Sequence, residues 1–293
     1  MEVWPNFFIV GAPRTGTHSL YAYLKQHPQV FMSPRKEPQY FSRGSIPDDH
    51  PIIQPVRNDN DYFSLFKDVK NEIAIGEASV SYLSDPLAPK LIHEKVPNAR
   101  IIIILRDPAE RAYSHYLALV KKNRTSLTFY EEIKNDMKKL ENGENENGIL
   151  HLGFYYDSIK RYYCFFNKKN VQVLLSEEFE KNVKETVINV LKFLSIDKDF
   201  QFDITKQAIY RPPTRKKIKS ILTNKIIVDT GKKLISSSKI RKIFFQKIVR
   251  PTKERPKMIQ KERLLLRKIY FEDVNKTKQL LGKKLPWITF ESI

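Results

Sequence analysis

The sequence of 293 residues contains one cysteine, Cys164, which excludes an internal disulfide and fits a reducing compartment. It contains no run of about 18 apolar residues, the length that a membrane-spanning helix requires. The first residues lack the basic region and long apolar core of a signal peptide. These absences predict a cytoplasmic protein without a transmembrane helix.

Acidic residues are scarce in one part of the chain. The net charge is +19, and residues 211–268 contain 20 lysines and arginines against three acidic residues. This segment therefore carries +17, and the remainder of the chain is close to neutral. The charge predicts an anionic partner, which could be a sulfated or uronic polymer, an anionic membrane or a nucleic acid, or else a solvated basic face. Nucleic acid is the least favoured partner, because the segment has few aromatic residues and no nucleic-acid-binding motif.

Strand-like and helix-like patterns alternate along the chain, which predicts an α/β fold with a central parallel sheet flanked by helices. The predicted strands are apolar runs at residues 7–10, 29–32, 74–75, 100–105 and 171–175. The predicted helices cover residues 17–27, 86–96, 109–121, 155–166, 183–194 and 262–281. Residues 42–62 are rich in Pro, Asp and Asn and predict an irregular surface insertion. We expect a single domain over residues 1–293, with a basic helical segment at about 211–268 and a C-terminal helix at about 262–281.

The most informative stretch that is present reads FFIVGAPRTGTHSLYAY, at residues 7–23. An apolar strand enters a short loop with Gly11 and Gly16, and the chain leaves the loop as a helix. Backbone N–H groups at a helix N-terminus bind anions, so this pattern predicts a phosphate loop. The side chains that add hydrogen-bond donors to it are Arg14, Thr15, Thr17, His18 and Ser19.

The loop lacks two residues that nucleotide hydrolases have. Gly11 and Gly16 keep the spacing of G-x-x-x-x-G-K-[ST], but Thr17 occupies the lysine position and His18 replaces the hydroxyl residue that holds Mg²⁺. The cation of the loop is instead Arg14. The sequence therefore predicts a phosphate-binding loop without the usual magnesium ligand, and an ordinary strand-to-helix turn is the alternative.

Two further strand ends carry polar residues, and in a parallel sheet ligands bind at the carboxyl ends of the strands. Glu77 and Ser79 follow one strand, and Arg106 and Ser114 follow another. Arginine binds phosphate through its planar fork and serine adds a short donor, so Arg106 and Ser114 could converge only across a bound anion. Two anion clamps indicate a ligand with two separated phosphate-type groups. An ion pair between Arg106 and an acidic residue of the following helix is the alternative.

The segments GAPRTGTHSL, KEPQYF, GEASVSYL and ILRDPAERAYSHY occur in an order and spacing that resemble the sulfotransferases that use 3′-phosphoadenosine 5′-phosphosulfate (PAPS). Later segments agree, namely GFYYDSIKRYYCFF, VLLSEEF, VLKFLSI and LLGKKLPW. The resemblance covers nearly the whole chain and is strongest for bacterial and glycan (heparan sulfate type) members. It implies a three-layer P-loop-like fold, PAPS as the sulfuryl donor with PAP as the product, and no metal.

The resemblance also implies a donor site. The residues that would bind PAPS are Arg14, Thr15, Gly16, Thr17, His18, Ser19, Arg106, Ser114, Tyr155 and Arg215. Those of the loop would hold the 5′-phosphosulfate, and the pair Arg106 and Ser114 would hold the 3′-phosphate. Tyr155 would contact the adenine side, and Arg215 lies where a basic loop closes over the donor.

The resemblance further implies a glutamate base. Glycan-type members use the glutamate before an x-x-[FY]-F pair, which is Glu37 in this chain. Glu77 is a rival base, and a surface ion pair of Glu37 with Arg35 or Lys36 is the alternative. The candidates for substrate binding are Lys36, Glu77 and Ser79. Heparan enzymes often place a lysine directly after the second glutamate, and this chain has Ala78 there, which argues against a heparan-like acceptor.

The implied chemistry is in-line transfer of a sulfuryl group to an acceptor hydroxyl or amine through a loose transition state. Glu37 would take the acceptor proton, and Arg14 would stabilise the charge on the leaving oxygen. We expect a carbohydrate or another hydroxyl or amine acceptor, neutral or anionic, and contact of the basic segment with an anionic polymer or membrane. An ATP-dependent kinase and a non-catalytic polyanion-binding protein are the alternative functions.

Overall fold

The protein is described by a computed structural model that covers residues 2–48, 53–143, 148–204 and 256–291. At its centre lies a five-stranded parallel sheet in the order β2-β3-β1-β4-β5. The strands are β1 (Phe7–Gly11), β2 (Val30–Met32), β3 (Ala74–Ala78), β4 (Arg100–Leu105) and β5 (Val171–Leu175). The predicted parallel α/β class is confirmed, and each predicted strand is present with its ends shifted by no more than a few residues.

The central strand β1 is apolar along its whole length because both faces of the sheet are covered. Phe7 and Ile9 belong to one buried cluster, whereas Phe8 and Val10 belong to another. Successive side chains of a strand point to opposite faces, so the two clusters lie on opposite sides of the sheet. All four side chains are 0% exposed, as expected for a parallel strand that is buried on both faces.

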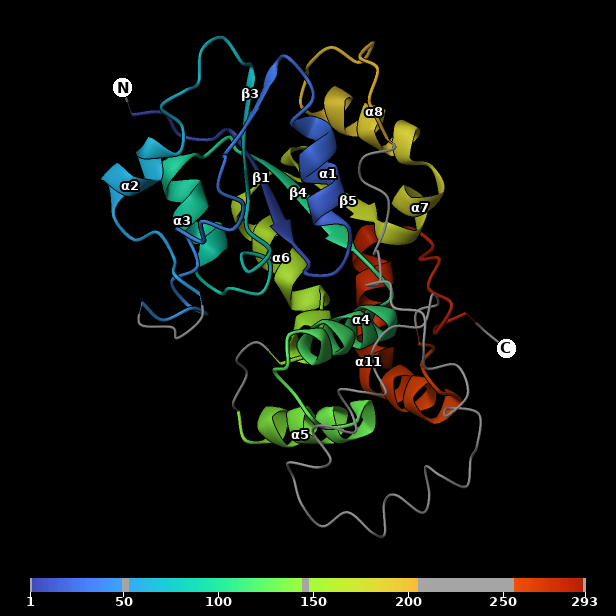
Figure 1. Ribbon diagram of the computed structural model, residues 1–293. Helices are drawn as coiled ribbons and strands as arrows, with labels where there is room; N and C mark the ends of the chain where they lie inside the picture. The colour runs from blue at the N-terminus through green and yellow to red at the C-terminus, as the bar shows by residue number, and fades with distance from the viewer. Residues whose placement is uncertain (1, 49–52, 144–147, 205–255, 292–293) are drawn as a thin grey trace, which may run out of the picture.

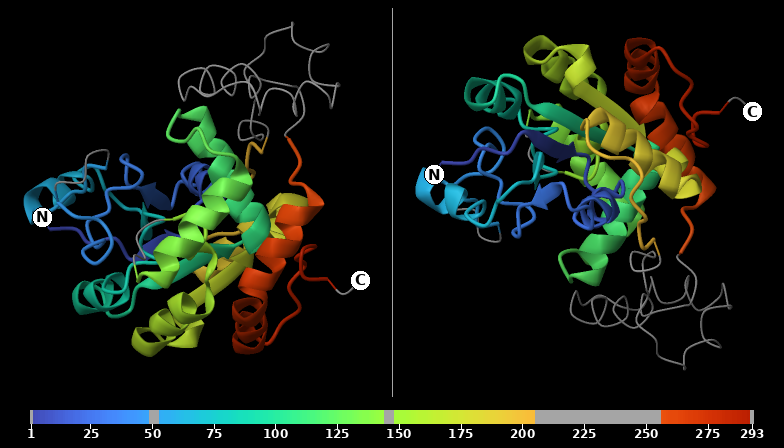
Figure 2. Two further views of the ribbon diagram at one scale, coloured as in Figure 1. Left: turned by 90° about the horizontal axis from the view of Figure 1, so that it is seen from below. Right: turned by 90° about the horizontal axis from the view of Figure 1, so that it is seen from above.

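Helices form a layer on each face of this sheet, as Figures 1 and 2 show. The first face is covered by α1 (Thr17–Leu24), α7 (Ser176–Lys181) and α8 (Val183–Phe193). The second face is covered by α3 (Ala88–Lys95), α4 (Pro108–Lys121), α6 (Tyr156–Phe165) and α11 (Gln260–Leu281). The predicted three-layer arrangement is therefore confirmed.

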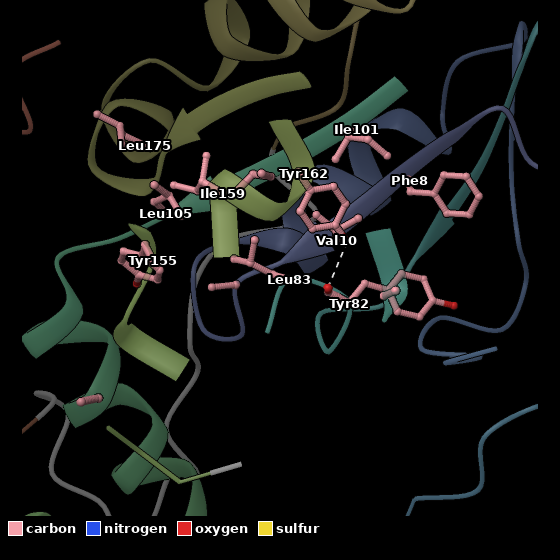
Figure 3. Close-up of a cluster of buried hydrophobic side chains, with 14 of the residues drawn as sticks. Phe8, Val10, Tyr82, Leu83, Ile101, Leu105, Tyr155, Ile159, Tyr162 and Leu175 are labelled. Carbon is pink, nitrogen blue, oxygen red and sulfur yellow. Dashed lines mark hydrogen bonds between the residues drawn. The ribbon is translucent and has the colours of Figure 1, made fainter. Parts of the chain in front are cut away.

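The core on the second face reaches the segment that follows β3. Leu105 of β4 lies in the same buried cluster as Ile159 and Tyr162 of α6 (Figure 3). The Tyr162 hydroxyl donates a hydrogen bond to the Tyr82 carbonyl at 3.0 Å. This bond ties the helix layer to the segment that follows β3 at the carboxyl edge of the sheet.

Among the described residues, three α-helices occur where the sequence patterns predicted none, namely α2 (Asp59–Ser64), α5 (Phe129–Glu141) and α7. Helix α2 lies at the end of the stretch that was expected to be irregular. The Asn58 side chain caps it by accepting a hydrogen bond from the Asp61 N–H at 2.8 Å. The Asn and Asp residues that indicated a loop therefore start a short helix, because these residue types favour both turns and helix N-caps.

The C-terminal helix is confirmed as α11 and begins two residues before its predicted start. Most of the basic segment at residues 211–268, including Arg215, lies outside the described residues. Within the described residues, no helix is both long enough and apolar enough to cross a membrane. The single-domain organisation stays a prediction.

Candidate functional site

Two glycines with positive φ shape the loop between β1 and α1. Gly11 has a φ of 146° and Gly16 a φ of 101°. A Cβ atom on Gly11 would lie 2.7 Å from the Cβ of Leu83, so only glycine allows the loop to approach the segment after β3 this closely. Thr15 fixes the loop from within, since its hydroxyl donates to the Ala12 carbonyl at 2.7 Å.

Helix α1 presents its N-terminus to this loop. Its N-cap residue is a glycine, and among the described residues no side chain caps the helix. An uncapped helix N-terminus favours anions through its N–H groups and its dipole. The side chains of Arg14 and His18 are exposed, that of Ser19 is partly exposed, and those of Thr15 and Thr17 are buried. The Thr15 hydroxyl already donates to the Ala12 carbonyl, so Thr15 would meet an anion through its backbone N–H.

Arg14 joins the phosphate loop to the end of β4. Its Nε donates to the Ser114 Oγ at 3.3 Å, and Arg106 Nη1 donates to the Arg14 carbonyl at 3.3 Å. The sequence led us to expect that Arg106 and Ser114 could converge only across an anion. In the structure, Arg14 contacts both residues, so the two predicted anion clamps are direct neighbours.

The acidic residues that follow Arg106 have other partners. Asp107 is the N-cap of α4, and its second carboxylate oxygen accepts from the Thr289 N–H at 2.9 Å. Glu110 pairs with Arg263 at 2.7 Å. These contacts do not support an ion pair as the explanation of Arg106.

Tyr155 supports the end of β4 from inside the core. It is 1% exposed, and its hydroxyl donates to the Arg106 carbonyl at 3.0 Å. Burial raises the pKa of this hydroxyl far above its usual value, so it remains a donor. The predicted adenine contact stays a prediction, and the observed burial favours a supporting role behind Arg106.

Glu37 lies beside the carboxyl end of β3. Its N–H donates to the Ala78 carbonyl at 2.9 Å, and its Oε2 accepts from the Val80 N–H at 2.8 Å. Its Oε1 pairs with the Lys36 ammonium, which is one of the two ion pairs that the sequence offered. The side chain is held by these contacts and is still 27% exposed, so it reaches the surface of the site.

His18 lies in the electrostatic field of both the phosphate loop and the Glu37 segment. Desolvation lowers its pKa, the charges of Lys36 and Arg14 lower it further, and Glu37 raises it. The charges of Arg14, Lys36 and Glu37 thus all act on His18, at the N-terminus of α1. His115, which follows Ser114 in the sequence, is neutral near pH 7, because burial lowers its pKa to about 3.

Glu77 lies within β3 and is 0% exposed. Its Oε2 accepts hydrogen bonds from the hydroxyls of Tyr62 at 2.7 Å and Tyr82 at 2.9 Å. Burial raises the pKa of Glu77 to about 7, although hydrogen bonds oppose the rise. Ser79 is also 0% exposed, and its hydroxyl accepts from the Gln39 N–H at 3.0 Å. Substrate binding by Glu77 and Ser79 stays a prediction, and their burial argues against it.

The two tyrosines that contact Glu77 were missed as part of the site. Tyr82 occurs in the segment GEASVSYL, where its spacing from Glu77 was visible but gave no indication of a hydrogen bond. No sequence pattern indicated Tyr62 as a site residue, because it belongs to the stretch that was predicted to be irregular.

The fold and the site together define a class of protein. A phosphate loop, an arginine–serine pair and a partly exposed glutamate lie at the carboxyl ends of parallel strands. This arrangement favours the binding of an anionic ligand at this edge of the sheet. The family model described as the sulfotransferase domain matches residues 5–244, and the chain belongs to this family. It has the P-loop-like fold of the sulfotransferases, and the kinase alternative loses its support.

Relatives of the chain agree with this assignment. Carbohydrate sulfotransferase 15 of Homo sapiens is 28% identical over 252 residues, covering 66% of this chain and 44% of the relative. Bifunctional heparan sulfate N-deacetylase/N-sulfotransferase 4 of Mus musculus is 27% identical over 212 residues, covering 68% of this chain and 23% of the relative. The chain thus spans less than half the length of these curated relatives. A sulfotransferase from Alicyclobacillus acidocaldarius has a TM-score of 0.75 at 28% identity, over 97% of this chain and 98% of that one.

Proposed function

We propose that the protein transfers a sulfuryl group from PAPS to a hydroxyl or amine of a carbohydrate acceptor, with Glu37 as the base. The observation that carries the proposal is the meeting of Arg14, Arg106 and Ser114 at one edge of the sheet. PAPS has two separate anionic groups, and the phosphate loop and the end of β4 offer two adjacent sites of positive charge. The Glu37 carboxylate lies in the same region.

The residues divide between the two ends of the donor. The N-terminus of α1 with Arg14 would hold the 5′-phosphosulfate, through backbone N–H groups and the guanidinium. Arg106 and Ser114 would hold the 3′-phosphate. Tyr155 would keep the Arg106 backbone in place, and the role of Arg215 stays an expectation from the family pattern.

The transfer requires one proton movement and one charge stabilisation. The acceptor oxygen or nitrogen forms a bond to sulfur while the bond between sulfur and the bridging phosphate oxygen breaks. The acceptor proton passes to the Glu37 carboxylate, and the guanidinium of Arg14 stabilises the negative charge that develops on the leaving oxygen. Arginine acts here electrostatically, because it does not readily give up a proton.

Glu37 is a better base than Glu77 on grounds of access. The Glu37 side chain is 27% exposed, whereas Glu77 is 0% exposed and is enclosed by tyrosine hydroxyls. A general base must come within hydrogen-bond reach of the acceptor proton. Lys36, which is 11% exposed and contacts Glu37, is the candidate for acceptor binding beside the base.

The proposed acceptor class rests on the relatives and on charge. One relative is named for carbohydrate and another for heparan sulfate. A basic segment would attract an anionic polysaccharide over a range of about 10 Å at moderate salt. Ala78 stands where heparan enzymes often have a lysine, so we propose a glycan acceptor without assigning it to heparan sulfate. A cytoplasmic location and independence of metal are further parts of the proposal.

Binding of PAP tests the donor site. We expect PAP to raise the melting temperature equally with and without EDTA, since a ligand that binds only the folded state stabilises it. Arg106→Ala should abolish this shift. Arg100→Ala is the matched control at the opposite end of the same strand, where Arg100 contacts Ser195, and should keep it. No shift in the wild type, or a strict requirement for Mg²⁺, would refute the proposed donor.

Transfer of labelled sulfate from PAPS to a panel of oligosaccharides, lipids, phenols and peptides tests the reaction itself. We expect label on a carbohydrate and its loss in Arg14→Ala. The basic segment also favours a non-catalytic polyanion-binding protein as a second candidate. Retention on heparin that survives Arg14→Ala, with no sulfation of any acceptor, would favour this second function.

A further inference from the structure

A buried carboxyl group borders the loop that carries Glu37. Glu77 is 0% exposed and accepts hydrogen bonds from Tyr62 and Tyr82, which are also 0% exposed. A substrate has no path to touch Glu77 in this arrangement. Any part that Glu77 plays in the reaction must therefore pass through the residues that it contacts.

Tyr82 links Glu77 to the backbone of the Glu37 loop. Its hydroxyl donates to Glu77 and accepts from the Phe41 N–H at 3.2 Å. A tyrosine hydroxyl has one hydrogen, and its lone pairs are oriented by where that hydrogen points. Because the Tyr82 hydroxyl donates its hydrogen to the Glu77 carboxyl group, a lone pair of the hydroxyl oxygen points toward the Phe41 N–H. The two bonds form a chain from the buried carboxyl group to the loop.

Two further contacts hold the same loop. The ring of Tyr62 stacks on that of Tyr40, with centroids 4.1 Å apart and planes at 22°. Ser79 accepts a hydrogen bond from the Gln39 N–H at 3.0 Å. Residues 39, 40 and 41 are thus held by Ser79, Tyr62 and Tyr82, in that order. Both tyrosines contact Glu77.

The loop needs this support because of its backbone conformation. Glu37 has a φ of 65° and Gln39 a φ of 59°, in the left-handed region that residues with a Cβ rarely adopt. Such residues keep this conformation only where the surrounding structure holds them in it. The conformation matters for the site, since it places the Glu37 carboxylate on the Val80 N–H.

We propose that Glu77 is a positioning residue for Glu37. It orients Tyr82 and Tyr62, and these two side chains hold the loop so that the Glu37 carboxylate stays at the site. The inference rests on the proposed function, in which Glu37 is the base. It gives Glu77 no contact with substrate and no part in proton transfer.

Two conservative variants test the positioning role. Tyr82→Phe removes only the hydroxyl, and Glu77→Gln keeps the size of the side chain but replaces one acceptor oxygen with a donor. Tyr116→Phe is the matched control, because the Tyr116 hydroxyl also donates one hydrogen bond inside the protein, to the Leu127 carbonyl at 3.0 Å. Turnover at saturating PAPS, KM for PAPS and amide hydrogen exchange at residues 36–41 are measured for each.

We expect both positioning variants to lower kcat about tenfold or more, to leave KM for PAPS within about twofold, and to speed exchange at residues 36–41. The double variant should lose no more than the larger single loss, because both changes break the same chain of bonds. Tyr116→Phe should leave kcat and the exchange of this loop unchanged.

A folded Tyr82→Phe protein with wild-type kcat and wild-type exchange would overturn the inference. An equal loss of kcat and of PAPS affinity in all three variants would also overturn it, since general loosening explains that result. Hydrogen exchange needs no turnover. A wild-type protein that transfers no sulfate would therefore refute the proposed function, and the exchange of the loop would still decide the positioning role.

Discussion

Arg14 shows at the residue scale how one residue can join the two parts of the proposed donor site through its side chain and its backbone. Its guanidinium donates to Ser114, and its carbonyl accepts from Arg106, although these residues lie about a hundred positions away in the sequence. A guanidinium carries donors in a rigid planar fork, whereas a lysine ammonium is a point charge on a flexible stem. An arginine in the loop can therefore connect the loop to the end of β4 while keeping its charge near a bound anion.

The role of Glu37 is tested by Glu37→Gln. The amide keeps the size of the side chain and can still accept from the Val80 N–H, but it cannot take a proton from the acceptor. We expect turnover to fall by roughly two to four orders of magnitude, with the dissociation constant of PAP unchanged. Steady-state transfer of labelled sulfate and calorimetric titration with PAP measure the two quantities.

Glu94→Gln is the matched control for this substitution. Glu94 also pairs with a lysine, Lys90 at 3.7 Å, but it lies on the exposed surface of α3. The control should keep full turnover. Retained turnover in Glu37→Gln, together with its loss in Glu77→Gln, would contradict the assignment of the base.

At the scale of elements, the segment after α11 supports the turn between β4 and α4. Thr289 donates its N–H to Asp107, the residue directly after Arg106. Trp287 is 0% exposed, and its ring centroid lies 5.8 Å from that of Tyr155, which holds the Arg106 carbonyl. The end of one strand is thus braced by a segment from the far end of the chain.

The two tryptophans of the chain allow a test of this bracing. Trp287→Phe reduces the packing against Tyr155 without breaking a hydrogen bond, since Trp287 Nε1 has no partner among the described residues. We expect it to lower the free energy of unfolding by about 2 kcal/mol and to weaken PAP binding several-fold. Trp4→Phe, which alters packing at the other end of the chain against Tyr40 and Tyr62, should leave PAP affinity unchanged. If Trp287→Phe binds PAP as tightly as Trp4→Phe and the wild type do, the segment after α11 does not support the donor site.

At the scale of the whole molecule, local patterns predicted the sheet and its ligand-binding edge well. The run RIIIIL is buried on both faces as β4, and the stretch at residues 7–23 forms the expected strand, loop and helix. These features depend on neighbouring residues and on the general rule for parallel sheets. The meeting of Arg106 with the loop follows from the same rule, because β1 and β4 are adjacent strands.

Features that depend on distant partners could not be predicted in this way. Glu77 was expected at a strand-to-loop junction, and its burial depends on hydroxyls from Tyr62 and Tyr82, which no local pattern pairs with it. The contact between Arg14 and Ser114 depends on side-chain directions in two separate elements. The sequence gives the residue types of a site more readily than it gives which of them face the ligand.

The buried carboxyl group of Glu77 should make the stability of the whole molecule depend on pH. Its pKa is 4.5 when unperturbed and about 7 in the folded protein, so the folded state holds the proton more tightly. This contribution to stability is fully present below pH 4.5 and is lost as pH rises through 7. Between about pH 6.5 and 8.5 the loss of this proton should lower the free energy of unfolding of the wild type by about 1 kcal/mol. Glu77→Gln has no such proton, so its free energy of unfolding should not fall by this amount over the same range.

Chemical denaturation at several pH values measures this difference. His115 acts in the opposite direction, but its pKa falls from 6.5 to about 3 on folding, so its effect lies below pH 6.5. A difference between wild type and variant that stays constant from about pH 6.5 to 8.5 would contradict the raised pKa of Glu77.

The contact between Thr289 and Asp107 has a consequence for the protein during its synthesis. The phosphate loop, at residues 11–17, leaves the ribosome well before Thr289, which lies more than 270 positions later in the sequence. The turn after Arg106 gains its hydrogen bond from Thr289 only after the phosphate loop and the Thr289 segment have both folded onto the sheet. We therefore expect a nascent chain to gain its full affinity for the donor only after α11 and the segment that follows it have docked.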